Sequence, residues 1–261
     1  MASDVKDCKS WGILGCGWLG MSFAQAKLGK GDIVWGTTRT DLRGEDLKAQ
    51  GIQPVLMDLA SPNSLWDAWP GWDALVIALP PGASASADQV AQIRKRMDAS
   101  VWNVMVSSTS VYPSKPGIYE EGDALHRVSP HSGVDVLEVE KQWMGAKTTF
   151  LRCSGIIGPG RHLFRKGRGL LPSDRWVNVV HQVDVIRAIS HVVGTRLAGP
   201  VNVSAPVHRT WNECFQQSEC SQPSQHPEHR SINSGRLIES GFDFKFADPM
   251  CMPHLFPEPT P

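Results

Sequence analysis

The fold is inferred from the stretch Trp11-Gly12-Ile13-Leu14-Gly15-Cys16-Gly17-Trp18-Leu19-Gly20. It has the form of a short apolar strand, a G-x-G-x-x-G turn and the first residues of a helix. Gly15 permits the tight turn, Gly17 lacks the Cβ that would block a pyrophosphate, and Gly20 lets helix and strand pack closely. The helix N-terminus adds N–H groups that attract phosphate. We therefore expect a dinucleotide site made by Gly15, Gly17, Trp18, Leu19 and Gly20. The alternative is a structural turn that binds no ligand.

A second apolar stretch, Asp32-Ile33-Val34-Trp35-Gly36, lies where a βαβ unit needs its second strand. In NAD-binding units an acidic residue about twenty positions beyond the glycines hydrogen-bonds the ribose 2′-OH. Here that place holds Thr38 and Arg39, whose hydroxyl and guanidinium suit a 2′-phosphate. We predict NADP(H) rather than NAD as the cofactor; a solvated Arg39 in a surface loop is the alternative.

Apolar and amphipathic segments alternate from residue 10 to about residue 150. This alternation predicts an α/β fold, a doubly wound parallel sheet of the NAD(P)-binding Rossmann type. The clearest strand is Ala74–Leu79, an unbroken apolar run of the kind that is covered on both faces. Ligands bind at the carboxyl ends of strands in such sheets. Four residues at strand ends are therefore expected to complete the cofactor site: Asp58, Leu79, Pro80 and Ser107. Capping of a helix or turn is an equal alternative for Asp58.

The chain has 261 residues, enough for one large α/β domain that carries a small lobe. We expect an NADP-binding Rossmann domain over residues 10–155, interleaved with some later elements. A mostly small C-terminal substrate lobe is expected over residues 156–256, and a flexible, proline-containing tail over residues 257–261.

The composition excludes several classes of function. Basic and acidic residues balance at 26 each, so no basic field predicts nucleic-acid binding. The longest apolar run is too short for a membrane span, and the first residues lack the apolar core of a signal peptide. The six cysteines are scattered without a C-x-x-C pair, which argues against a zinc site or a disulfide scaffold. We expect a cytoplasmic protein with reduced thiols, a small-molecule substrate and no metal.

Six motifs stand in a fixed order along the chain: G-C-G-W-L-G at Gly15–Gly20, S-S-T-S-V-Y at Ser107–Tyr112, L-R-C-S-G-I-I-G-P-G-R at Leu151–Arg161, V-N-V-V-H-Q-V-D at Val177–Asp184, V-N-V-S from Val201 and R-L-I-E-S-G-F from Arg236. Together they make the sequence resemble the extended short-chain dehydrogenase/reductase family, of the NAD(P)-dependent epimerase/dehydratase type. The resemblance covers about residues 10–250. It implies a nicotinamide cofactor, and a homodimer is one arrangement that such folds commonly adopt.

The chain departs from this family at the catalytic positions. Members carry a serine or threonine four residues before the tyrosine of S-x-x-x-V-Y, and Ser108 occupies that place. They also carry a Y-x-x-x-K pair, whose tyrosine is the general acid/base and whose lysine lowers the tyrosine pKa. Matching the family's glutamate to Glu140 places Ser132 at the tyrosine position and Val136 at the lysine position. The chain thus resembles an atypical member that lacks the pair.

Neighbouring side chains are candidates for proton transfer or substrate binding. His131 adjoins the tyrosine position and titrates near neutrality, although a solvated loop histidine is the alternative. Ser108, His131 and Ser132 are therefore the catalytic candidates. Arg161 and His162 are candidate anchors for an anionic substrate. The resemblance places His181 near the substrate cleft as a further substrate-binding candidate, with helix capping by Asp184 as the alternative. A basic surface loop is the alternative for Arg161 and His162.

Three functions follow from these residues. The first is an NADP(H)-binding, oxidoreductase-like enzyme that acts on a small anionic metabolite. The second is a non-catalytic NADP(H)-binding sensor or regulatory protein, which the missing Y-x-x-x-K pair favours. The third, a sugar epimerase or dehydratase, needs the tyrosine that the chain lacks.

Overall fold

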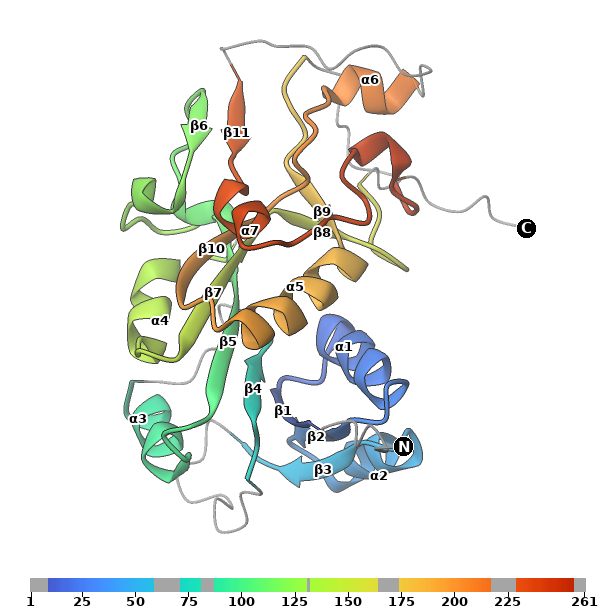
Figure 1. Cartoon of the computed structure of the whole chain (residues 1–261), viewed down its shortest axis with the longest axis vertical. Helices are drawn as coiled ribbons and strands as arrows, with labels where there is room; N and C mark the ends of the chain where they lie inside the picture. The colour runs from blue at the N-terminus through green and yellow to red at the C-terminus, as the bar shows by residue number, and fades with distance from the viewer. Residues whose placement is uncertain are drawn as a thin grey trace, which may run out of the picture. The chain divides into compact units, whose positions relative to one another are not determined.

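The computed structural model describes residues 9–58, 71–80, 87–130, 132–163, 174–216 and 229–255. The chain divides into two compact units (Figure 1). Unit 1 comprises residues 1–106 and 138–149, and unit 2 comprises residues 107–137 and 150–261. In the described part of the chain, no helix has the length and apolar character needed to cross a membrane.

Seven strands form the principal sheet, in the order β10-β7-β5-β4-β1-β2-β3. The pairs β1–β2, β1–β4, β2–β3 and β4–β5 are parallel. Strand order reverses beside β1, the arrangement of a doubly wound Rossmann sheet. The predicted fold class is confirmed. The strands are β1 (Ser10–Leu14), β2 (Ile33–Thr38), β3 (Gln53–Leu56), β4 (Ala74–Ile77), β5 (Trp102–Ser108), β7 (Thr148–Cys153) and β10 (Gly199–Val203).

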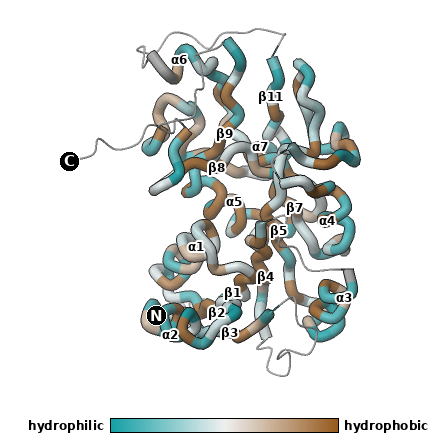
Figure 2. Tube along the Cα trace, turned by 180° about the vertical axis from the view of Figure 1, so that it is seen from behind, coloured by the Kyte–Doolittle hydropathy of each residue, from teal (hydrophilic) through white to brown (hydrophobic). Residues whose placement is uncertain are grey.

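The helices of unit 1 follow the strands along the chain: α1 (Trp18–Leu28), α2 (Asp41–Ala49), α3 (Ala87–Arg96) and most of α4 (Val136–Trp143). All four residues of β4 are buried, as an unbroken apolar run requires. Figure 2 shows a hydrophobic β4 and, by contrast, a largely hydrophilic α3. The N-cap of α2 is Thr40, whose hydroxyl accepts from the Arg43 N–H.

A buried lysine joins α1 to the strands of unit 1. The Lys27 ammonium lies 4.0 Å from the centre of the Trp11 ring and 3.6 Å from the Asp32 carboxylate. The Trp11 indole N–H also donates to Asp32, at 2.9 Å. Burial, the largest effect, lowers the Lys27 pKa to about 8, against the opposing attraction of Asp32. This contact fixes the start of β1 against the end of α1.

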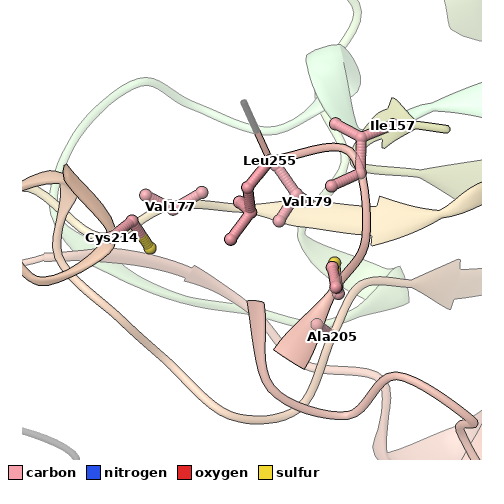
Figure 3. Packing of buried hydrophobic residues seen from close by; sticks show 7 residues of the cluster. Ile157, Val177, Val179, Ala205, Cys214 and Leu255 are labelled. Atoms are coloured by element: carbon pink, nitrogen blue, oxygen red, sulfur yellow. The ribbon is translucent and has the colours of Figure 1, made fainter. Parts of the chain in front are cut away.

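Unit 2 contains two small parallel sheets, β6 (Gly117–Tyr119) with β11 (Arg230–Ile232) and β8 (Gly155–Ile157) with β9 (Val179–His181). Its helices are α5 (Gln182–Thr195), α6 (Trp211–Gln216) and α7 (Gly235–Glu239). One apolar cluster packs β8 and β9 against later parts of the chain (Figure 3). Its buried members are Ile157, Val177, Val179, Ala205, Cys214, Met252 and Leu255.

Three short segments of polar or mixed composition belong to strands. Strand β5 extends through Ser107 and Ser108, so both serines are part of the strand. Tyr119 lies on β6, which pairs with β11. Arg230 and Ser231 belong to β11. The predicted tail over 257–261 lies outside the described residues.

Candidate functional site

The glycine turn of unit 1 has the geometry expected of a phosphate-binding turn. Gly15 has φ +99°, a conformation that favours glycine, and a Cβ there would lie 3.0 Å from the Ala78 carbonyl oxygen. A Cβ at Gly20 would collide with the Gly15 carbonyl oxygen, so α1 packs closely on the turn. By contrast, a Cβ at Gly17 would meet no atom of the described residues within 4 Å. The missing side chain at Gly17 therefore leaves open space rather than relieving an internal clash.

The start of α1 is also suited to an anion. Gly17 is its N-cap and supplies no side-chain cap, and the first turn contains no acidic residue that would compete with a phosphate. The Gly15 N–H donates to the Thr37 hydroxyl at 3.1 Å, which ties the turn to β2. The residues present fit the pyrophosphate of a dinucleotide.

The other predicted cofactor residues are placed as follows. Leu79 meets the glycine turn, since a Cβ at Gly15 would lie 3.1 Å from a Leu79 methyl group. Arg39 is exposed at the end of β2, whereas Thr38 is buried with its hydroxyl 3.3 Å from the Thr40 carbonyl oxygen. Pro80 is exposed. Trp18, Leu19 and Asp58 are partly buried, while Ser107 is buried and belongs to unit 2.

Arg43 is a cation near the glycine turn that the sequence reading missed. Its charge acts on the Cys16 thiol, although burial is the larger effect and raises the Cys16 pKa to about 11. The Arg43 guanidinium also lies 3.4 Å from the Asp46 carboxylate. Arg39 precedes α2 and Arg43 lies in its first turn, so both guanidinium groups come from the segment that follows β2.

Unit 2 contains a pocket of about 370 Å³ at the end of β5. Ser108 lines it, and its hydroxyl accepts from the Ser110 N–H at 3.1 Å. Two arginines, Arg127 and Arg230, provide positive charge to the lining. The remaining lining residues are Thr109, Ser110, Tyr112, Ser114, Pro130, Cys153, Ser154, Gly155 and Asn178.

The phenol of Tyr112 is held inside unit 2. It donates to the Asn202 side-chain oxygen at 2.6 Å and accepts from the Arg152 guanidinium at 3.1 Å. Burial raises the Tyr112 pKa, with Arg152 opposing that effect. These bonds occupy the hydroxyl, so Tyr112 is a structural member of the pocket wall.

The two positions aligned with the family's Y-x-x-x-K pair have different surroundings. Val136 is only 2% exposed and packs with Val111, Tyr112 and Ile232. The Ser132 hydroxyl oxygen is buried and, within the described residues, has no hydrogen-bond partner. Ser132 does not line the described pocket, and His131 lies outside the described residues. The catalytic roles of Ser108, His131 and Ser132 therefore remain predictions.

The predicted substrate anchors lie elsewhere in unit 2. Arg161 is exposed, and none of the three lines the described pocket. His162 and His181 are linked through His254: His162 Nδ1 lies 3.2 Å from its carbonyl oxygen, and His181 Nε2 lies 3.4 Å from its Nδ1. His181 is the N-cap of α5, where its Nδ1 accepts from the Val183 N–H. The structure gives His181 a capping function, and substrate binding by these three residues remains a prediction.

The pH dependence of stability should report the state of His181. Burial, with the charge of His254 as a smaller cause, lowers the His181 pKa to about 4. Between pH 6.5 and pH 4 the unfolded chain then binds the extra proton, so stability is lost as the pH falls through this range. His181→Asn replaces the Nδ1 acceptor of the N-cap with an amide oxygen and removes the titration. Urea unfolding at pH 7 and pH 5 should show a smaller loss for the variant; an equal loss would contradict the assignment.

The sequence was compared with protein-family profiles and with known proteins. No protein-family profile matches it. Protein YeeZ of Escherichia coli (strain K12) is 31% identical over 273 aligned positions, which cover 94% of this chain and 99% of YeeZ.

Two solved structures share the fold of this chain. A candidate NAD-dependent epimerase/dehydratase from Methylobacillus flagellatus has a TM-score of 0.70 and 22% identity, covering 92% of this chain and 94% of that one. Vestitone reductase from alfalfa (Medicago sativa) has a TM-score of 0.70 and 19% identity, covering 91% and 94%. These likenesses agree with the Rossmann fold described above, and the identity to YeeZ across almost the whole of both sequences shows that the chain belongs to the YeeZ family.

Proposed function

We propose that the protein is an NADP(H)-binding, oxidoreductase-like enzyme acting on a small anionic metabolite. The observation that carries the proposal is the turn at Gly15–Gly20, with open space at Gly17 and a helix start free of acidic side chains. Gly15, Gly17 and Leu79 would hold the pyrophosphate region, and Arg39 with Arg43 the 2′-phosphate. When bound, NADP(H) accepts or supplies a hydride.

The pocket of unit 2 is the proposed substrate site. Ser108 presents a hydroxyl to it, and Arg127 and Arg230 supply positive charge for an anionic group. The solved structures with this fold include a candidate NAD-dependent epimerase/dehydratase and a reductase, which supports a nicotinamide cofactor for this chain.

A non-catalytic NADP(H) sensor is the second candidate, favoured by one observation. Val136, at the position where the family's lysine is expected, is a buried member of an apolar cluster. A charged lysine that holds the nicotinamide ribose is not available from that position. The same observation argues against a sugar epimerase or dehydratase of the usual mechanism.

Turnover separates the enzyme from the sensor. The purified protein would be incubated with NADPH and a panel of small carbonyl-containing acids, and loss of absorbance by the reduced cofactor would be followed. We expect cofactor oxidation with at least one acid and a loss of rate in Ser108→Ala. Tight NADPH binding with no oxidation for any acid would favour the sensor.

Cofactor preference is expected to follow the cations near the end of β2. NADPH should bind at least tenfold more tightly than NADH, a difference of ~1.4 kcal/mol, because a guanidinium pairs with the 2′-phosphate. Arg39→Ala should abolish the preference while leaving NADH affinity unchanged, and Arg43→Ala should reduce it. Titration by fluorescence measures both affinities. Equal affinities in the wild type, or an unchanged preference in Arg39→Ala, would contradict the assignment.

A further inference from the structure

Two guanidinium groups line the pocket of unit 2 without a carboxylate to neutralise them. Arg127 donates to the Tyr112 carbonyl oxygen at 2.9 Å. Arg230 donates to the carbonyl oxygens of Pro113, at 2.7 Å, and Thr109, at 2.8 Å. Within the described part of the chain, neither arginine forms an ion pair with an aspartate or glutamate. The carbonyl groups fix the two side chains but leave their charges uncompensated.

The two positive charges also act on each other. Burial is the larger cause of the lowered Arg230 pKa, and the charge of Arg127 lowers it further. Holding like charges near each other in a partly buried site costs free energy unless an anion lies between them. An oxyanion in the pocket would remove this repulsion, and the planar guanidinium fork matches the geometry of carboxylate and phosphate groups.

Hydroxyl groups with unused hydrogen-bonding capacity surround the same space. The hydroxyl oxygens of Ser110 and Ser154 are buried and have no partner in the described part of the chain. Both residues line the pocket, as does Ser108. Buried polar groups in native proteins are normally satisfied by protein, water or ligand. Both hydroxyl oxygens are shielded from solvent, so they would bond a molecule in the pocket only after their side chains rotate toward it.

We propose that this pocket binds the oxyanion group, a carboxylate or a phosphate, of a small polar metabolite between Arg127 and Arg230. Ser110 and Ser154 hydrogen-bond the rest of that molecule once their solvent-shielded hydroxyl groups rotate toward it. The proposal rests on the proposed function in taking the metabolite as the substrate. It replaces Arg161, His162 and His181 with another pair of anchors for the anionic group.

The pocket volume limits the size of the ligand. About 370 Å³ corresponds to the space of roughly a dozen water molecules in the liquid, near the lower end of ligand sites. This volume suits a short hydroxy or keto acid or a small phosphate ester.

Calorimetric titration of the full chain with inorganic phosphate and with malonate tests the proposal. Both probes are expected to bind, and the tighter of the two identifies the natural group as phosphate or carboxylate. Arg127→Lys and Arg230→Lys keep the charge but lose the planar fork, and each should weaken the tighter probe at least tenfold. Arg196→Lys is the matched control, because Arg196 is exposed at the end of α5 and lies outside the pocket lining. It should bind like the wild type.

A second pair of variants guards against unfolding, since Arg230 also holds the backbone of Pro113 and Thr109. Ser110→Ala and Ser154→Ala remove buried hydroxyls that have no described partner, so the fold should tolerate them. Each should weaken the binding of the probe several-fold. Wild-type affinity in all four pocket variants, or no binding of either probe to the wild type at millimolar concentration, would overturn the proposal.

Gly17→Val separates this proposal from the cofactor assignment. It should lose NADPH and retain the oxyanion probe, whereas Arg127→Lys should lose the probe and retain NADPH. If the probe were instead lost in Gly17→Val and kept in Arg127→Lys, the probe would be binding at the glycine turn and the pocket proposal would be wrong. If the wild type bound the oxyanion probe but not NADPH, only the proposed function would be refuted.

Discussion

Gly17→Val is expected to weaken NADPH binding at least a hundredfold while leaving the protein folded. The valine side chain would project into open space, because no atom in the described part of the chain lies within 4 Å of a Cβ at Gly17. That space is where a pyrophosphate must approach the start of α1. The backbone of Gly17, with φ −84°, is one that any residue adopts, so the substitution introduces no backbone strain. A hundredfold loss corresponds to ~2.7 kcal/mol of binding free energy.

Two other glycines provide controls for this variant. Gly71→Val makes the same change at an exposed glycine whose Cβ position has no atom of the described residues within 4 Å, and it should bind NADPH normally. Gly20→Val would force a side chain against the Gly15 carbonyl oxygen and should lower the melting temperature as well as the affinity. Fluorescence titration and thermal unfolding separate these cases. Wild-type affinity in a folded Gly17→Val would mean that the phosphates lie elsewhere.

Val136→Lys is expected to destabilise the protein by about 3 kcal/mol or more at pH 7. The substitution places an ammonium group in the apolar cluster of Val111, Tyr112 and Ile232, where Val136 is 2% exposed. Denaturant unfolding measures the loss. Val136→Ala is the control for lost packing and should cost about 2 kcal/mol.

The pH dependence identifies the cause of this loss. Burial lowers the pKa of the introduced lysine below its unfolded value of about 10.4. Between the folded pKa and about 10.4 the unfolded chain therefore binds more protons than the folded one, so the variant should regain stability relative to the wild type as the pH rises toward 10. Val136→Ala should show no such recovery. A lysine variant as stable as the wild type would show that position 136 is not buried. A lysine at the position aligned with the family's lysine would then be compatible with this fold.

The glycine turn and its supporting strands could be predicted because their signals are local. Gly15, Gly17 and Gly20 lie within six residues, and their spacing alone identifies the turn. The apolar run that forms β4 is likewise buried on both faces, as its composition indicates. The structure adds the contact that Gly15 makes with a distant part of the chain, because a Cβ there would lie 3.0 Å from the Ala78 carbonyl oxygen.

The pocket could not be predicted in this way. Arg127 and Arg230 are far apart in the sequence, and they share a pocket through carbonyl groups of the segment after β5. Strands β6 and β11 position Arg230, yet each has only three residues, too few to show a periodic pattern. For Arg161 and His181 the sequence suggested a charge that binds substrate. The structure shows an exposed side chain and a helix cap, respectively.

Val136 illustrates a further limit of the sequence. Alignment with a family motif shows that the lysine is missing, but an exposed valine and a buried one look the same in the sequence. Packing against Tyr112 and Ile232, which come from other segments, makes the position part of the core. The consequence of restoring a lysine can therefore be judged only from the fold.

A crystal structure of the protein with NADPH is the decisive measurement for the proposed function. We predict the pyrophosphate at Gly15 and Gly17, against the first turn of α1, and the 2′-phosphate at the Arg39 guanidinium. The side chain nearest to the nicotinamide would then identify the catalytic group. NADPH bound away from the glycine turn, or a turn that stays without nucleotide at saturating NADPH, would contradict the proposal.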